Sequence, residues 1–270
     1  MPQQITTFPT RAEFRTAVAT LQRLGLPHEI LSPEPGYGLV GVPAVVVAED
    51  APAQLAALAP GAFVGSGWVD YKPSPWPVPQ DPPAAFAEDV FGMPAIVVLA
   101  PCVADPHKLR LIAHTGGDLA AVMPYLNAEV PQVTYVDETH TLTTMDGYRM
   151  VSLYPGRLTI AKADDLVDAW RVLESLRCRV NAVWARRGAI TPSYECRQKP
   201  PALEIYRRLP GTSCRQCGEK TCMAFALRLW NGEVSPTACT PVFAGEYAHL
   251  REALLAICAG LGSPAVPPPP

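Results

Sequence analysis

The sequence lacks the signals of membrane and secreted proteins. No stretch approaches the roughly 18 uninterrupted apolar residues that a membrane span needs, and the N-terminus has no basic start followed by an apolar run, as a signal peptide would. We therefore expect a cytoplasmic protein with no membrane span. In a reducing compartment, clustered cysteines are more often metal ligands than disulfides.

Charge of either sign is also scarce. Charged residues make up 17% of the chain, and the net charge is −3. A nucleic-acid-binding surface needs a basic excess, and the five tryptophans form no stacking stripe, so we expect no nucleic-acid partner. The hydrophobic share of 49% over 270 residues suits two or three small domains with real cores.

The first section, residues 1–70, is predicted to be a small α/β domain. Thr10 and Glu13 form a capping box ahead of an amphipathic helix, and Gly25 suits the left-handed position that ends it. Two apolar runs, "HEIL" and "VPAVVVA", indicate strands, and "APAQLAALA" indicates a second helix. The order is β-α-β-β-α. Residues 71–85, which are rich in proline, are predicted to be a linker, either a plain spacer or an ordered strap.

The second section, residues 86–195, is predicted to be an α+β domain. "AIVVLA" and "LRLIAH" indicate strands, and Asp118 can cap a short helix that Pro124 breaks or kinks. A meander of about four antiparallel strands follows, with Asp146–Gly147 as a hairpin turn. A long helix is then capped by Asp164 or Asp165, packs its apolar stripe on the sheet, and ends at Gly188. The fold class is therefore α+β. Residues 263–270 are predicted to be a disordered tail.

The third section, residues 196–262, carries four cysteines with the spacing Cys-x2-Cys-x4-Cys-x16-Cys. These four motif cysteines are Cys214, Cys217, Cys222 and Cys239. A disulfide is disfavoured because cysteines two residues apart pair only with strain. Zinc sites usually use two short-spaced pairs, and only one such pair exists here. Three ligands from one loop suit an iron–sulfur cluster, so the spacing favours iron–sulfur over zinc but leaves zinc open.

The surroundings of the motif also favour a cluster. Gly211 and Gly218 allow positive φ and close approach of backbone amides to inorganic sulfide. "TCMAFALRLW" predicts a helix capped by Thr221, with Cys222 on its apolar face, and Asn231–Gly232 ends it.

These residues resemble a known family. "LPGTSCRQCGEKTCMAFALRLWNGE", followed by Cys-Thr-Pro, is similar to the four-cysteine domain of the acetyl-CoA synthase/CO dehydrogenase corrinoid iron–sulfur protein, which also occurs in the Rnf electron-transport complex. The resemblance covers about residues 197–256, and the section before it looks similar to uncharacterised iron–sulfur proteins. The resemblance of the cysteine segment implies that the four motif cysteines bind one [4Fe-4S] cluster per chain. The barrel and cobalamin domains of the corrinoid protein are not found, so corrinoid activation does not carry over.

Two positions depart from the family. Asparagine is usual where Ser213 stands, and glycine where Arg215 stands. An arginine there is expected to raise the reduction potential of an anionic cluster. Nearby basic residues either add to this effect or form a solvated patch; they are Arg207, Arg208, Lys220 and Arg228.

The other cysteines and carboxylates have simpler interpretations. Cys178 and Cys258 are predicted to be packing residues, and Cys196 is not expected to be a ligand. Cys102, His107 and His114 lack ligand spacing on one element, which favours structural roles over a second metal site. "HTGGDL" has neither the dinucleotide nor the phosphate-loop pattern. No residue is predicted to be catalytic.

The sequence therefore predicts a one-electron carrier or reductive activator that works with redox partner proteins. The alternative is a non-enzymatic binding or regulatory module in which the cluster is structural or senses redox state. An enzyme with a site in residues 86–195 has no nucleophile–base pair or cofactor motif behind it.

Overall fold

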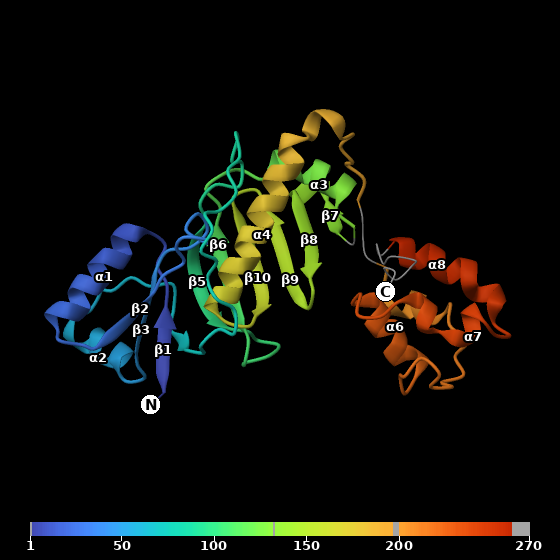
Figure 1. Ribbon diagram of the computed structural model, residues 1–270, viewed down its shortest axis with the longest axis horizontal. Coiled ribbons are helices and arrows are strands. Elements are labelled where there is room, and N and C mark those ends of the chain that lie inside the picture. The colour runs from blue at the N-terminus through green and yellow to red at the C-terminus, as the bar shows by residue number, and fades with distance from the viewer. Residues whose placement is uncertain (1, 132, 197–199, 261–270) are drawn as a thin grey trace. The chain divides into compact units, whose positions relative to one another are not determined.

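The computed structural model describes residues 2–131, 133–196 and 200–260 (Figure 1). The predicted tail at 263–270 lies outside these residues. Contacts group the chain into two compact units, residues 1–128 with 149–193, and residues 129–148 with 194–270. The first unit thus contains both the N-terminal section and most of the central section. Helices and antiparallel sheets are both present, which confirms the α+β class.

The N-terminal section forms a four-stranded sheet in the order β2-β3-β1-β4. Its strands are antiparallel wherever their pairing is recorded. Its elements are β1 (Gln3–Thr6), α1 (Arg11–Arg23), β2 (His28–Leu31), β3 (Ala44–Ala48), α2 (Ala51–Leu58) and β4 (Val69–Asp70). This order confirms the predicted β-α-β-β-α and adds β4. The Thr10 hydroxyl accepts a hydrogen bond from the Glu13 amide at 3.2 Å, and Gly25 has φ 68°. Both predicted ends of α1 are therefore confirmed.

The proline-rich segment after β4 packs against the first unit. The Gly36 amide donates to the Pro79 carbonyl at 3.0 Å. A Cβ at Gly36 would lie 2.7 Å from Pro79, so only glycine permits this approach. The segment acts as an ordered strap rather than a plain spacer.

The central sheet has six strands in the order β5-β6-β10-β9-β8-β7. They are β5 (Ala95–Pro101), β6 (Leu109–His114), β7 (Thr134–Val136), β8 (Thr141–Asp146), β9 (Arg149–Tyr154) and β10 (Arg157–Ala163). The predicted meander is confirmed, and Gly147 at the hairpin turn has φ 60°. β6 pairs antiparallel with β10, so β5 and β6 extend the meander at the β10 side.

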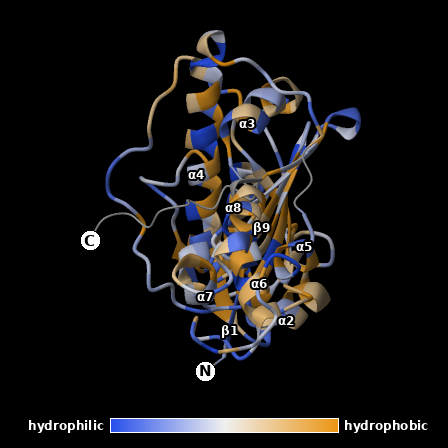
Figure 2. Cartoon of the chain, turned by 90° about the vertical axis from the view of Figure 1, so that its right-hand side faces the viewer, coloured by the Kyte–Doolittle hydropathy of each residue, from blue (hydrophilic) through white to orange (hydrophobic). Residues whose placement is uncertain are grey.

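Helix α4 (Leu166–Ala185) lies against this sheet (Figure 1). The Asp165 carboxylate caps it by accepting from the Asp168 amide at 2.9 Å. Hydrophobic and hydrophilic residues alternate along α4 (Figure 2), as the predicted stripe requires. The predicted end at Gly188 was wrong. The helix ends at Ala185, and Gly188 lies in a following 3-10 turn.

Ion pairs fasten α4 to the sheet. Arg149 of β9 makes two hydrogen bonds to the fully buried Asp168, at 2.7 and 2.9 Å.

Before the meander, Asp118 accepts from the Ala120 amide at 2.8 Å and begins a 3-10 turn over Ala120–Val122. Helix α3 (Met123–Glu129) follows directly. Pro124 therefore lies in the first turn of α3, where it costs no hydrogen bond, and does not break a helix.

The cysteine-bearing section has its own small helical core. Its helices are α5 (Ala202–Tyr206), α6 (Cys222–Trp230), α7 (Thr240–Phe243) and α8 (Arg251–Gly260). Their buried side chains form one hydrophobic cluster that includes Phe225, Leu229 and Leu254. No helix within the described residues is long and apolar enough to cross a membrane.

Candidate metal centre

The four motif cysteines line one cavity of the second unit, together with Phe225 and Pro241. They come from three places in the chain: the loop after Leu209, the start of α6, and the turn before α7. All eight cysteines of the chain are free thiols, so no disulfide competes for them. The structure thus brings together the four residues that the sequence singled out.

The loop that carries the first two cysteines has an unusual backbone. Four of its residues have positive φ: Gly211 (71°), Ser213 (51°), Arg215 (64°) and Gly218 (84°). The Gly218 amide donates to the Arg215 carbonyl at 3.0 Å and closes a tight turn across Cys217. Left-handed residues at such short intervals are typical of loops whose backbone amides form concave arrays, which suit anions such as iron-bound sulfide.

Two of the left-handed positions in this loop are not glycine. The residues that adopt this conformation most readily are glycine and asparagine. Serine at 213 and arginine at 215 adopt it at φ 51° and 64°. For an ordinary side chain this conformation costs about 1–2 kcal/mol. Ser213 and Arg215 therefore place strain in the ligand loop.

Helix α6 positions the third cysteine, Cys222. Thr221 caps this helix by accepting from the Ala224 amide at 3.1 Å, as predicted. Cys222 is 8% exposed and shares its face with the buried Phe225 and Leu229. The helix is capped at Asn231, and Gly232 has φ 75°. The predicted boundaries and the inward direction of Cys222 are confirmed.

The fourth cysteine sits where a 3-10 turn (Pro236–Ala238) meets α7. Cys239 is 5% exposed, and its carbonyl accepts from the Val242 amide at 3.0 Å. Burial raises the pKa of its thiol to about 11, and the other three motif cysteines contribute to the rise. A cationic group bound here would favour the thiolate form of these cysteines.

Exposure differs across the site. Cys214 is exposed and Cys217 is half-buried, whereas Cys222 and Cys239 are buried. Within the described residues, no group of three or more histidine, cysteine or acidic side chains is placed to hold a metal ion. The four thiols share a cavity. The four thiols are the candidate ligands, and the loop amides and an apolar wall lie around them. This arrangement fits an iron–sulfur cluster.

The basic residues near the motif divide into two groups. Arg207 and Arg208 both pair with Glu204, at 2.5 and 3.0 Å. Arg228 pairs with Glu219 and Glu233. Three of the predicted basic residues are therefore neutralised by carboxylates. Arg215 and Lys220 are exposed, and within the described part of the chain they have no ion-pair partner.

The remaining cysteines do not join the site's ligand set. Cys258 is buried in the same core, Cys178 donates to Glu174 at 3.2 Å, and Cys196 is exposed. Cys102 is buried beside β6, and its amide donates to the Lys108 carbonyl at 2.8 Å. These positions agree with the structural roles predicted for Cys102, Cys178 and Cys258.

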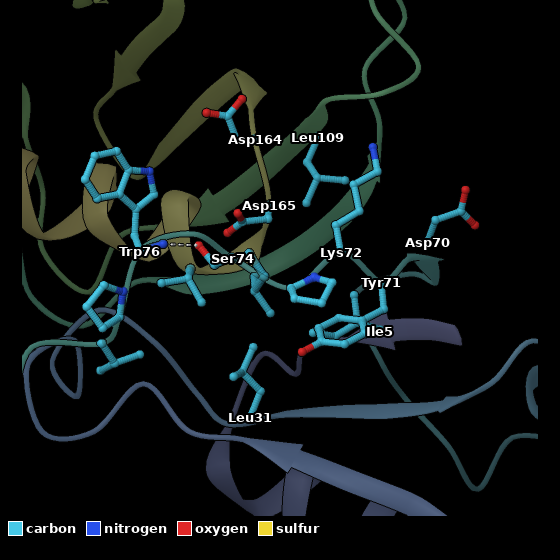
Figure 3. Close-up of a pocket in the computed structure, with 15 residues that line it drawn as sticks. Ile5, Leu31, Asp70, Tyr71, Lys72, Ser74, Trp76, Leu109, Asp164 and Asp165 are labelled. Carbon is cyan, nitrogen blue, oxygen red and sulfur yellow. Dashed lines mark hydrogen bonds between the residues drawn. The ribbon is translucent and has the colours of Figure 1, made fainter. Parts of the chain in front are cut away.

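A larger cavity of about 240 Å³ lies in the first unit, beneath the proline-rich strap (Figure 3). Three of its charged side chains already have structural partners. Asp165 lies beside Ser74 and caps α4, although burial raises the pKa of its carboxyl. Asp164 pairs with Arg149, and the Lys72 ammonium donates to the His107 carbonyl at 2.7 Å. This cavity therefore offers less binding chemistry than the cysteine site. No sequence signal indicated it, because distant segments build it.

Comparison with known proteins points to the same segment. A family model described as "Putative Fe-S cluster" matches residues 209–241. The cysteine segment is thus similar to an iron–sulfur cluster domain. Subunit gamma 2 of the acetyl-CoA decarbonylase/synthase complex of Methanosarcina thermophila is 46% identical over 74 residues, which is 24% of this chain and 16% of that subunit.

Two further relatives agree. The corrinoid/iron-sulfur protein large subunit of Moorella thermoacetica is 49% identical over 37 residues, 14% of this chain and 8% of that protein. The gamma subunit of the Methanothermobacter thermautotrophicus complex is 44% identical over 55 residues, 20% of this chain and 12% of that subunit. The chain thus spans under a fifth of the length of these relatives. No solved structure matches it significantly.

Proposed function

We propose that the four motif cysteines hold one [4Fe-4S] cluster and that the protein carries single electrons to or from a partner protein. The observation that carries this proposal is the convergence of four free thiols, from three chain segments, on one cavity. A cluster with four thiolate ligands exchanges one electron at a time and has no open iron site for substrate chemistry.

The protein residues support such a role in two ways. Cys222, Phe225 and Leu229 supply a buried apolar wall, which limits water and holds the potential of the site steady. Cys214 reaches the surface and gives a short path to a partner. We assign no catalytic residue.

The partner is proposed to be a protein, because the relatives are named as subunits of an acetyl-CoA decarbonylase/synthase complex or as a corrinoid/iron-sulfur subunit. Eight free cysteines suit a reducing compartment, so we propose the cytoplasm.

One observation favours a second candidate, a module in which the cluster is structural or senses redox state. Cys222 and Cys239 belong to the hydrophobic core of their domain. Without the cluster, Cys222 and Cys239 would remain in the core as unpaired thiolates, or the core would have to open to expose them. Folding of the domain and binding of the cluster are therefore coupled.

Reductive titration of the anaerobically reconstituted protein distinguishes the two. An electron carrier takes up one electron per chain reversibly and keeps its fold in both states. Failure to reduce the cluster with a donor of physiological strength would reject electron transfer. Loss of a specific partner interaction on cluster removal, without reversible reduction, would support the structural or sensing role.

A further inference from the structure

The exposed corner of the cysteine site carries an uncompensated positive charge. Arg215 directly follows Cys214, and Lys220 lies two residues before Cys222. Both are exposed, as is Cys214 itself. Cys214 and Arg215 line the same cavity, and we call these two residues together with the exposed Lys220 of the same loop the Cys214 face.

The charges on this face differ from those around it. The other arginines near the motif are held by Glu204, Glu219 and Glu233. Glu219, the acidic residue within the loop, is thereby bound to Arg228. Within the described residues, Arg215 and Lys220 are therefore left to act on a partner, although the whole chain is slightly acidic at −3.

The backbone adds a second observation. Arg215 holds a left-handed conformation at φ 64°, which an arginine adopts only at a cost. The Arg215 side chain is exposed and forms no ion pair among the described residues. No ion pair within the domain therefore offsets the cost of its left-handed backbone. Apart from its expected effect on the potential of a cluster in the cavity that it lines, the benefit of arginine at this position is to be sought outside the folded domain.

From these observations we propose that the Cys214 face is the docking surface for an acidic electron-transfer protein. The proposal rests on the electron-carrier function proposed above. In the docked complex the reduced partner loses one electron and the cluster gains it, and no proton or group moves. Complementary charge raises the association rate and fixes the exposed thiolate corner toward the donor.

The test compares two double charge reversals in the reconstituted full chain. Arg215→Glu with Lys220→Glu removes the positive face. Arg15→Glu with Arg23→Glu is the matched control, because both residues lie on α1, away from the cysteine domain in sequence, and the net charge changes equally. Each pair changes the net charge by four, from −3 to −7. Binding of an acidic flavodoxin is measured with both proteins oxidised. The rate of electron transfer from the flavodoxin hydroquinone is then measured by stopped flow.

We expect the face reversal to weaken binding and to slow association about tenfold or more at low salt, with both effects shrinking as ionic strength rises. The control pair should stay within about twofold of the parent. Reduction by methyl viologen, a small cation, reports a change in potential without docking, so in the face reversal it should slow much less than reduction by the flavodoxin. Basic cytochrome c should not bind the parent face.

Three results would overturn the proposal. The first is an equal loss of flavodoxin association in the face reversal and in the control pair, and the second is a loss that does not depend on ionic strength. The third is an equal slowing of reduction by methyl viologen and by flavodoxin, which would trace the effect to the potential of the cluster rather than to docking. If no donor, including methyl viologen, reduces the parent protein, the electron-carrier function fails instead.

Discussion

The strained backbone at Arg215 leads to a sharp prediction about glycine and alanine. At ordinary φ, glycine is less stable than alanine by about 0.5–1 kcal/mol, because glycine loses more conformational freedom on folding. At φ 64° the order should reverse, because alanine pays about 1–2 kcal/mol for the left-handed region and glycine does not. Arg215→Gly should therefore be more stable than Arg215→Ala by roughly 0.5–1 kcal/mol.

The comparison separates strain from charge, since both variants remove the arginine charge. Gln216 supplies the control, because it is the next residue, it is exposed, and it is not among the residues with positive φ. Gln216→Ala should be more stable than Gln216→Gly.

Native-state amide hydrogen exchange over α6 is a suitable assay, because it reports the opening of this domain rather than of the whole chain. A difference of 1 kcal/mol appears as about a fivefold change in exchange rate. If alanine is more stable than glycine at both positions, the left-handed backbone at Arg215 is refuted, and with it the strain that we assign to the ligand loop.

Other substitutions test separate parts of the fold. Thr221→Ala should remove the cap of α6 and cost about 1 kcal/mol by the same exchange assay, whereas Thr221→Ser should cost far less; equal costs would reject the capping hydrogen bond. Phe225→Ala should cost about 3–5 kcal/mol and speed cluster loss, followed by visible absorbance, and Phe225→Leu should cost clearly less. Asp168→Ala leaves Arg149 without its buried partner, so a loss of about 3–5 kcal/mol is expected in urea unfolding followed by circular dichroism. A loss within error of zero would show that the pair is solvated.

Local signals in the sequence predicted most of the fold correctly. The capping box at Thr10, the Asp146–Gly147 turn and the apolar stripe of α4 each depend on residues within a few positions of one another. Helix ends were harder to predict, because the end of α4 at Ala185 is followed by a 3-10 turn. Gly188 was a misleading signal for that reason.

Features built by distant residues could not be predicted in the same way. The pairing of β6 with β10 joins segments over 40 residues apart, and the strap meets Gly36 across a similar distance. The carboxylates that neutralise Arg207 and Arg228 were not evident from the spacing, since their directions depend on how the loops and helix ends pack.

The candidate site was easier to predict than its surroundings. Cysteine spacing limits which groups can be bound, so the four candidate ligands follow from the sequence alone. The left-handed backbone at Ser213 and Arg215 was not predicted, because neither residue signals it.

The central claim is tested most directly by metal analysis with electron paramagnetic resonance on protein prepared without oxygen. Iron and acid-labile sulfide are counted per chain, and the spectrum is recorded after reduction. We predict about four irons and four sulfides per chain, with a spin-one-half signal that appears on reduction. One zinc per chain with no iron or sulfide would contradict the claim.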